Sequence, residues 1–296
     1  MTLLLILREI QKHPILSKAF GLRGGTAINL FWFNLPRLSV DIDLNYIQHQ
    51  SKAEMEQHRP VVEKDLQRLL ESMTITVQHI PGSHAGGKWR LRNASSLGGQ
   101  FTLELDLNYI MRIPILGTHL KPSFAPDPDY ETEFPIVSME ELFTGKIKAL
   151  MERAAPRDLY DVVSLATLQP AIDRKSLRKI ILLFGLTCEK DWRAMKLETL
   201  DSIDQKSVDR ELLPLLRSGE RINAEHLRKA GVDFLAGLLV YDEKETEFLN
   251  KFYAKGEYLP ELLFTDPVVA EKARKHPAVL WKLKNHSIFL GLESKQ

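Results

Sequence analysis

Cysteine is nearly absent from this chain of 296 residues. Its one cysteine, Cys188, excludes an intramolecular disulfide and any zinc site built from several thiolates. Such low cysteine usage suits a reducing compartment, so we expect the protein in the cytoplasm. The nine histidines show no metal-ligand spacing such as H-E-x-x-H, and none of them is assigned to a metal.

Long hydrophobic runs are lacking as well. No stretch approaches the ~20 apolar residues that are needed to cross a bilayer. The apolar opening MTLLLILREI has no basic segment before it and ends at Arg8 and Glu9, so we interpret it as the start of a buried helix rather than an export signal. We therefore expect no membrane partner.

The chain also lacks an excess of charge of one sign. Forty Lys and Arg residues oppose thirty-nine Asp and Glu residues, which gives a formal net charge of +1. Any affinity for a nucleic acid must then come from a local patch. With 44% hydrophobic and 27% charged residues, the composition is that of a globular protein of one or two domains.

Two kinds of hydrophobic pattern divide the chain into halves. Residues 38–47 and 101–110 alternate as strands do, whereas helical patterns alone follow one another from Ser138 onward. We predict an α/β fold, with a small mixed-sheet domain in residues 1–137 and a helical domain in residues 138–296 that helps to enclose the functional site. Further predictions are helices over 2–20 and 52–71, strands over 73–80 and 88–92, a turn at 21–25, and a Pro-rich connection without one rigid conformation at 117–136.

Two aspartates one residue apart, Asp41 and Asp43, stand at the polar positions of the first alternating segment. On a strand their carboxylates project from one face and repel each other, and shared divalent cations would relieve this repulsion. Oxygen ligands favour Mg²⁺ or Mn²⁺. Asp106 is the candidate for a third carboxylate of a two-metal site for phosphoryl transfer, and Glu104 is the reserve choice. A solvated strand edge is the alternative interpretation of the pair alone.

A glycine pair, Gly24 and Gly25, precedes a helical stretch in which Thr26 suits the first turn. Glycines allow close backbone approach, and free N–H groups at a helix start favour phosphate, so an NTP could place its phosphates here and its metals on the aspartates. The segment has neither the G-x-G-x-x-G fingerprint nor a P-loop. A simple helix-entry turn without a ligand is the alternative.

Three blocks of sequence together resemble the AbiEii/AbiGii toxin group of the polymerase-β-like nucleotidyltransferase superfamily, which belongs to abortive-infection and toxin–antitoxin systems. The group combines a GGTA turn, an R-x-S-x-D-x-D segment, and a helix with lysine and arginine followed by R-D-x-x-D. The resemblance covers about residues 15–170. The matching residues are Gly24, Gly25, Thr26 and Ala27, then Arg37, Ser39, Asp41 and Asp43, then Lys146, Arg153, Arg157, Asp158 and Asp161.

The resemblance implies an enzyme that moves a nucleoside monophosphate from an NTP onto an acceptor hydroxyl and releases pyrophosphate. Lys146 and Arg153, which fall on one helix face, would meet triphosphate oxygens, and Asp158 would orient the lysine or take part in proton transfer. Arg37 and Ser39 would contact the nucleotide, and in the family the serine can itself become the acceptor. The acceptor could be the 3′ end of a tRNA, and a cognate antitoxin protein would neutralise the toxin. A salt-bridge network between domains is the alternative role of the Lys146 cluster.

Other functions share part of this pattern. A metal-dependent nuclease would use the three aspartates without an NTP, and a small-molecule or protein nucleotidyltransferase would differ only in its acceptor. A non-catalytic nucleotide-binding module would keep the fold and bind the NTP.

A basic strand is the last candidate site. In the segment KWRLR, the cations Lys88, Arg90 and Arg92 alternate with Trp89 and Leu91, so one face of the expected strand is basic. This face could contact phosphate or an RNA backbone, or it is simply a solvated face.

Overall fold

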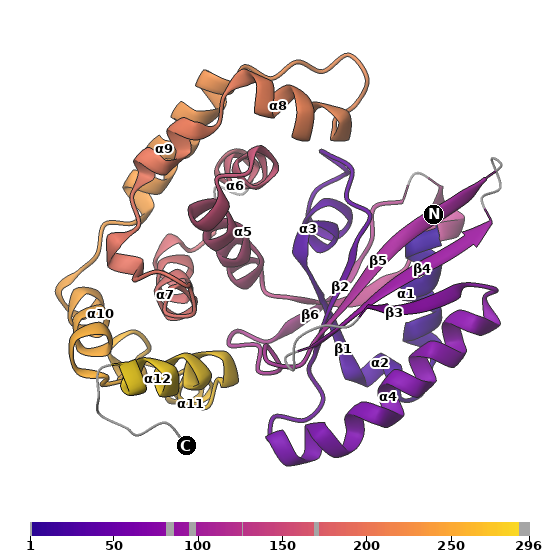
Figure 1. The fold of residues 1–296 in the computed structure, drawn as a ribbon, viewed down its shortest axis with the longest axis horizontal. Coiled ribbons are helices and arrows are strands. Elements are labelled where there is room, and N and C mark those ends of the chain that lie inside the picture. The colour runs from indigo at the N-terminus through magenta and orange to yellow at the C-terminus, as the bar shows by residue number, and fades with distance from the viewer. Residues whose placement is uncertain (1, 81–85, 95–98, 126, 169–171, 290–296) are drawn as a thin grey trace. The chain divides into compact units, whose positions relative to one another are not determined.

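The computed structural model describes residues 2–80, 86–94, 99–125, 127–168 and 172–289. They form two compact units, Met1–Ser138 and Met139–Gln296. The first unit combines a sheet with helices and the second is helical, so the predicted α/β class is confirmed (Figure 1).

The first unit is built on a mixed seven-stranded sheet of order β3-β4-β5-β2-β1-β7-β6. Strands β2 and β5 are parallel, as are β1 and β7, whereas the other neighbours are antiparallel. The strands are β1 (Phe20–Arg23), β2 (Ile42–Tyr46), β3 (Thr76–Ile80), β4 (Gly86–Ala94), β5 (Gln100–Asn108), β6 (Thr118–Pro122) and β7 (Glu133–Val137).

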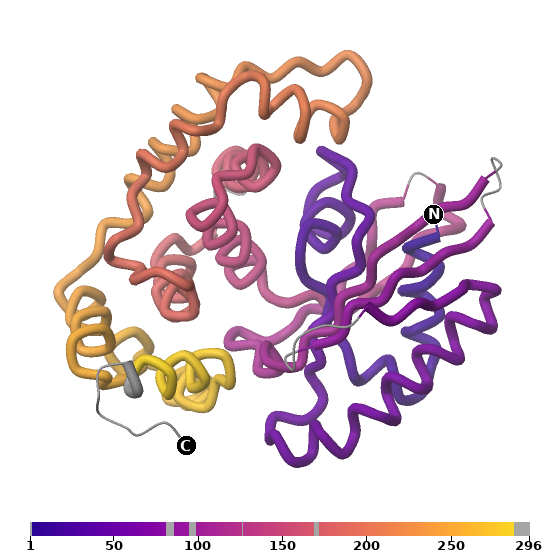
Figure 2. Tube along the Cα trace, viewed as in Figure 1, coloured from indigo at the N-terminus to yellow at the C-terminus, as the bar shows by residue number. Residues whose placement is uncertain are grey.

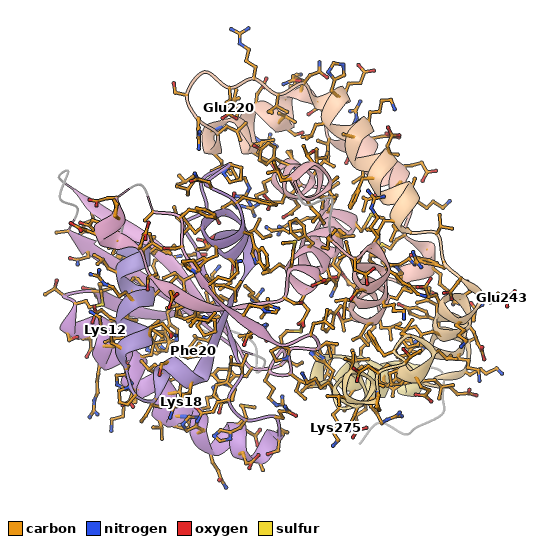
Figure 3. All side chains as sticks on the ribbon, turned by 180° about the vertical axis from the view of Figure 1, so that it is seen from behind. Lys12, Lys18, Phe20, Glu220, Glu243 and Lys275 are labelled. Atoms are coloured by element: carbon orange, nitrogen blue, oxygen red, sulfur yellow. The ribbon has the colours of Figure 1, made fainter. Side chains whose placement is uncertain are left out.

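Helices α1 (Thr2–Lys12), α2 (Leu16–Ala19) and α4 (Lys52–Ser72) lie on one face of this sheet, and the short α3 (Gly24–Ala27) lies on the other (Figure 1). The opening segment is a helix, as predicted, because its apolar residues recur at helical spacing and are buried. Among the side chains labelled in Figure 3, Phe20 is fully buried at the start of β1, whereas Lys12 and Lys18 are exposed. The apolar side of the sheet is thus the core side.

Two predictions about the first unit are wrong. Residues 20–23, expected at the junction of a helix and a turn, form the interior strand β1, and residues 117–136, expected as a connection, supply the paired strands β6 and β7. We expected no strand here because the segment is rich in proline. Proline is tolerated where a strand has few ladder partners: β6 is an edge strand, and β7 has one register pair with β1, at Ile136. β1 and β7 pair with each other although they lie far apart in the sequence, whereas β6 pairs with the next strand along the chain, β7.

The segment before β2 also differs from prediction. The strand begins at Ile42, and Leu38 and Val40, expected on the buried side, are 54% and 44% exposed. Ile42 and Leu44 are fully buried, so the predicted alternation holds only from Ile42 onward.

The second unit is helical throughout the residues that the structure describes, as the pattern predicts. Cys188 is buried within it. Within the described parts of the chain, no helix has the length and apolar character to span a membrane. The helices of the second unit are α5 (Met139–Arg153), α6 (Pro156–Leu168), α7 (Arg174–Gly185), α8 (Gln205–Glu211), α9 (Ala224–Leu238), α10 (Glu243–Lys255), α11 (Pro267–Arg274) and α12 (Pro277–Phe289), with short 3-10 turns between them.

Candidate active site

One row of charged residues crosses four neighbouring strands of the first unit. Arg23 on β1 is the register partner of Asp43 on β2, Asp43 is the partner of Asp106 on β5, and Asp106 is the partner of Lys88 on β4. Register partners project from the same face of a sheet. The sheet therefore brings together Asp43 and Asp106, which lie 63 positions apart in sequence numbering, and places a cation on either side of them.

Arg23 contacts both carboxylates of the row. Its Nη2 lies 3.7 Å from Oδ1 of Asp43 and 3.9 Å from Oδ1 of Asp106. Partial burial raises the pKa of the Asp106 carboxyl, Arg23 opposes this effect, and the negative charge of Asp43 adds to it. A carboxylate with a raised pKa is a better proton acceptor than an ordinary one.

Gly24 is required at its position for two reasons. Its φ of 76° lies in the left-handed region, which side-chain-bearing residues rarely adopt. A Cβ atom built there would also lie 2.0 Å from Oδ2 of Asp43, so the backbone of the glycine turn contacts the carboxylate directly. Gly25 is buried and its carbonyl oxygen accepts a hydrogen bond from Asn29 Nδ2 at 2.7 Å. The turn and the aspartate predicted to share a site therefore touch.

The glycine turn opens a short helix that ends at Trp32, and residues 33–41 between this helix and β2 are irregular. α3 passes into the π-helical turn η1 (Ile28–Trp32), and the trace in Figure 2 leaves β1 through this segment and returns as β2. π-Turns are rare and occur frequently at functional sites. Here the turn ends at Phe33, whose N–H donates to the carbonyl of Ile28.

Thr26 ties this helix to the entry of β2. Its hydroxyl is fully buried, donates to the backbone oxygen of Asp41 at 2.5 Å, and lies 3.2 Å from Oγ of Ser39. The side chain therefore positions the aspartate segment, and only the backbone N–H of Thr26 is left to meet a phosphate. Asp41 itself is exposed, directly before the first residue of the strand.

Arg37 has a structural environment. It is 4% exposed, its Nη1 donates to the carbonyl of Leu38 at 2.9 Å, and its N–H donates to Oδ1 of Asn29 at 3.3 Å. This arrangement holds the loop before β2 against the helix. Nucleotide contact by Arg37 and Ser39, which the resemblance implied, stays a prediction.

The reserve carboxylate lies one step away from the charged row. Glu104 Oε2 is 2.5 Å from Lys88 Nζ, and Glu104 Oε1 is 3.6 Å from Arg90 Nη2. The bond to Lys88 lowers the pKa of the Glu104 carboxyl, and the same bond raises the pKa of Lys88, with smaller contributions from the charges of Asp106 and Asp41. Glu104 is thus engaged with β4, whereas Asp106 faces Asp43.

The donor chemistry of the row fits a hard divalent cation. Asp43 and Asp106 present carboxylate oxygens that already share one cationic neighbour, and Asp41 is within electrostatic reach of the same Lys88 that adjoins Asp106. Oxygen ligands of this kind suit Mg²⁺ or Mn²⁺. The described residues include no cluster of three or more His, Cys, Asp or Glu side chains around one metal position, so metal binding here needs side-chain adjustment or substrate oxygens.

The Lys146 cluster lies inside the helical unit. Lys146 Nζ is 3.2 Å from Asp158 Oδ1 and 3.0 Å from Asp161 Oδ2, and Arg153 Nη2 is 2.6 Å from Asp158 Oδ2. Both aspartates are almost fully buried, and the Lys146 side chain is 13% exposed. The cluster joins α5 to α6 and balances two cations against two anions. Asp158 pairs with Lys146 in this cluster, and the roles that the resemblance implied for both residues stay predictions.

Sequence reasoning missed Arg23 and the part that Lys88 plays beside Asp106. Arg23 directly precedes the glycine pair in GLRGGT, so its closeness to the turn was visible in the sequence. Its contact with two aspartates was not, because that contact depends on β1 pairing with β2.

Comparison with known proteins defines the class. The family model for the nucleotidyl transferase AbiEii toxin of type IV toxin–antitoxin systems matches residues 5–255. Since the match covers most of the chain, this protein belongs to the AbiEii family of nucleotidyltransferase toxins. The family resemblance and the enzyme class inferred from the three motifs are confirmed.

Solved structures place the fold more closely. The chain is similar to MenT4, a nucleotidyltransferase toxin from Mycobacterium tuberculosis H37Rv, with a TM-score of 0.61 and 15% identity over 95% of this chain and 90% of that one. It is also similar to JHP933 from Helicobacter pylori, with a TM-score of 0.55 and 17% identity over 85% of this chain and 95% of that one. At these identities the likeness concerns the fold. The search of curated proteins gave no match.

Proposed function

We propose that this enzyme transfers a nucleoside monophosphate from an NTP to the 3′-terminal hydroxyl of an RNA, with tRNA as the cellular acceptor. The observation that carries the reaction type is the pairing of Asp43 with Asp106 beside the Gly24 turn. The acceptor follows from family membership and is the part of the proposal that most needs a test.

We assign Asp41, Asp43 and Asp106 to the metal site. Bound there, Mg²⁺ or Mn²⁺ would stabilise the negative charge that develops on the attacking and leaving oxygens. Gly24, Gly25 and the backbone N–H of Thr26 would receive the phosphates of the NTP. Arg23, which already contacts both carboxylates, adds positive charge at the same place.

Asp106 accepts the proton of the attacking hydroxyl in this proposal. Its side chain is 45% exposed, so an acceptor can reach it. Lys146, Arg153 and Asp158 are assigned to the nucleotide by family resemblance alone. Blocking tRNA would arrest translation, and a cognate antitoxin would counteract the enzyme in the cytoplasm, where NTP and tRNA are present.

The test is a labelling experiment. The purified enzyme is incubated with each α-labelled NTP, Mg²⁺ and total RNA, and the labelled product is identified. Label at the 3′ end of tRNA, lost in Asp43→Asn and kept in Glu71→Gln, supports the proposal, because Glu71 is an exposed carboxylate on α4, on the other face of the sheet. Label in a protein or a small molecule instead of RNA would refute the proposed acceptor, and label retained in Asp43→Asn would refute the proposed site.

A further inference from the structure

The face of the sheet that carries Asp43 and Asp106 continues over β4. Alternation along β4 sends Trp89 and Leu91 into the core, where they are 1% and 0% exposed, on the side of the sheet that α4 occupies (Figure 1). Lys88, Arg90 and Arg92 therefore project from the opposite face. We call these three residues the β4 basic row.

Polar, mostly uncharged neighbours surround the β4 basic row. Arg92 is paired with Thr76 on β3 and Thr102 on β5, and Arg90 is paired with Gln78 and Glu104. Lys88 is paired with Ile80 and Asp106, so three cations face two carboxylates, which leaves one positive charge in excess. Arg92 is exposed and forms no ion pair with any residue in the described ranges. The row can accept a polyanion without breaking up the fold.

The geometry of the row fits one sugar–phosphate strand. Alternate residues of a β-strand are roughly 6.6 Å apart, so the three cations form a straight line about 13 Å long. Such a line follows successive phosphates of a single extended strand rather than the two strands of a duplex. Among the described residues of β3, β4 and β5, this face carries no aromatic side chain on which a base could stack. Contact is therefore with phosphates and does not read base sequence.

The row begins at the catalytic carboxylates. Lys88 is the register partner of Asp106, and Arg90 and Arg92 lie successively farther along β4. We propose that the β4 basic row binds the backbone of an unpaired RNA 3′ tail and leads its terminal hydroxyl to Asp106. This inference rests on the proposed function, because it takes RNA as the acceptor, and it adds where the RNA lies and which form of RNA is accepted.

The proposal predicts a measurable salt dependence. Each phosphate neutralised on a single strand contributes about −0.7 to the slope of log affinity against log salt concentration, so three contacts give a slope of about −2. Between 50 and 200 mM salt the affinity should then fall about 20-fold. Loss of one cation should make the slope less steep by about 0.7.

The experiment measures binding of RNA to the full chain by fluorescence anisotropy, without NTP, at several salt concentrations. The probes are a hairpin RNA with four unpaired 3′ nucleotides and the same hairpin with a blunt end. We expect the tailed RNA to bind more tightly, and Arg92→Gln and Arg90→Gln each to weaken its binding and reduce the slope. Changing the sequence of the tail should leave its affinity the same within about twofold, since only phosphates are contacted.

The control is Arg68→Gln. Arg68 is an exposed arginine on α4, on the other face of the sheet, so this variant loses the same charge without touching the row. Equal affinity and slope in Arg92→Gln, Arg68→Gln and the unaltered protein would overturn the proposal, as would equal binding of blunt and tailed RNA or no RNA binding at all. Nucleotide transfer to RNA is measured in parallel. If the unaltered protein transfers nucleotide to RNA but Arg92→Gln binds RNA with unchanged affinity and slope, RNA binding by the β4 basic row is refuted and the proposed function stands. If the β4 basic row binds RNA but no nucleotide is transferred to it, the proposed acceptor is refuted.

Discussion

Replacing Gly24 by alanine should separate the activity of this enzyme from its stability. The new Cβ would lie 2.0 Å from Oδ2 of Asp43 and 2.8 Å from its Cγ. Ordinary contact begins at 3.4 Å, so the carboxylate must retreat by about 1.4 Å. A misplacement of about 1 Å in a catalytic group can cost about 100-fold in rate. We therefore expect Gly24→Ala to lose at least about 100-fold in nucleotide transfer.

The stability cost of the same change is small. A side-chain-bearing residue in the left-handed region costs roughly 1–2 kcal/mol, and domains of ordinary stability, about 5–15 kcal/mol, stay folded after such a loss. The assay combines urea unfolding with single-turnover transfer of a labelled nucleotide. A large loss of rate in a protein that is still folded would place the effect at Asp43.

Gly117→Ala provides the matched control. Gly117 has a similar φ of 82°, but a Cβ built there meets no atom within 4 Å. It should cost the same strain and leave transfer unchanged. The reasoning is refuted if Gly24→Ala transfers within about twofold of the unaltered enzyme, or if Gly117→Ala loses activity to the same extent.

Three further predictions concern the charged groups. Asp106→Asn should slow transfer by about 10²–10⁴-fold, as for loss of a general base, while Glu104→Gln stays within about tenfold; initial rates at saturating NTP and Mg²⁺ compare them, and the reverse order would make Glu104 the third carboxylate. In the metal-free protein, carboxyl NMR should find the pKa of Asp106 above its ordinary value. Arg23→Gln removes a cation and should raise this pKa further, whereas Glu104→Gln removes a negative neighbour and should lower it. A shift of the opposite sign in either variant would contradict the electrostatic assignment. Lys146→Met should lower the free energy of unfolding by about 3–5 kcal/mol, because its buried aspartates lose their shared cation, and urea denaturation measures this; a change below about 1 kcal/mol would mean that the buried network does not stabilise the helical unit.

Local periodicity explains what could be predicted from the sequence. Leu103, Leu105 and Leu107 alternate with polar residues and are buried in β5, as expected, and the long helix α4 follows from its helical spacing and its Ser51 cap. The acidic faces of two strands were likewise visible. Which strands are neighbours, and in which register, was not visible, because nothing local in either segment sets Asp43 opposite Asp106.

Pairing between distant segments explains what was missed. β1 has only four residues, one of them a glycine, and it is a strand because β2 and β7 lie on either side of it. That strand carries Arg23 to the aspartates, so the same non-local pairing hid both the strand and the site residue. Leu38 and Val40 are exposed for the opposite reason. Residues 38–41 alternate as a strand does, but among the described residues they pair with no strand, so their apolar side chains are not packed against the core.

The charged row also explains how two carboxylates are held together beside an apolar core. Across β1, β2, β5 and β4 the charges run positive, negative, negative, positive, so the row is neutral without any metal. Arg23 is 3.7 and 3.9 Å from the two carboxylates, beyond the distance of a strong hydrogen bond, and part of its charge therefore remains available. An incoming triphosphate brings negative charge and its cations bring positive charge, and both can replace contacts in the row without leaving a buried charge alone. A site balanced in this way is folded before its substrate arrives, which is the arrangement that electrostatic catalysis requires.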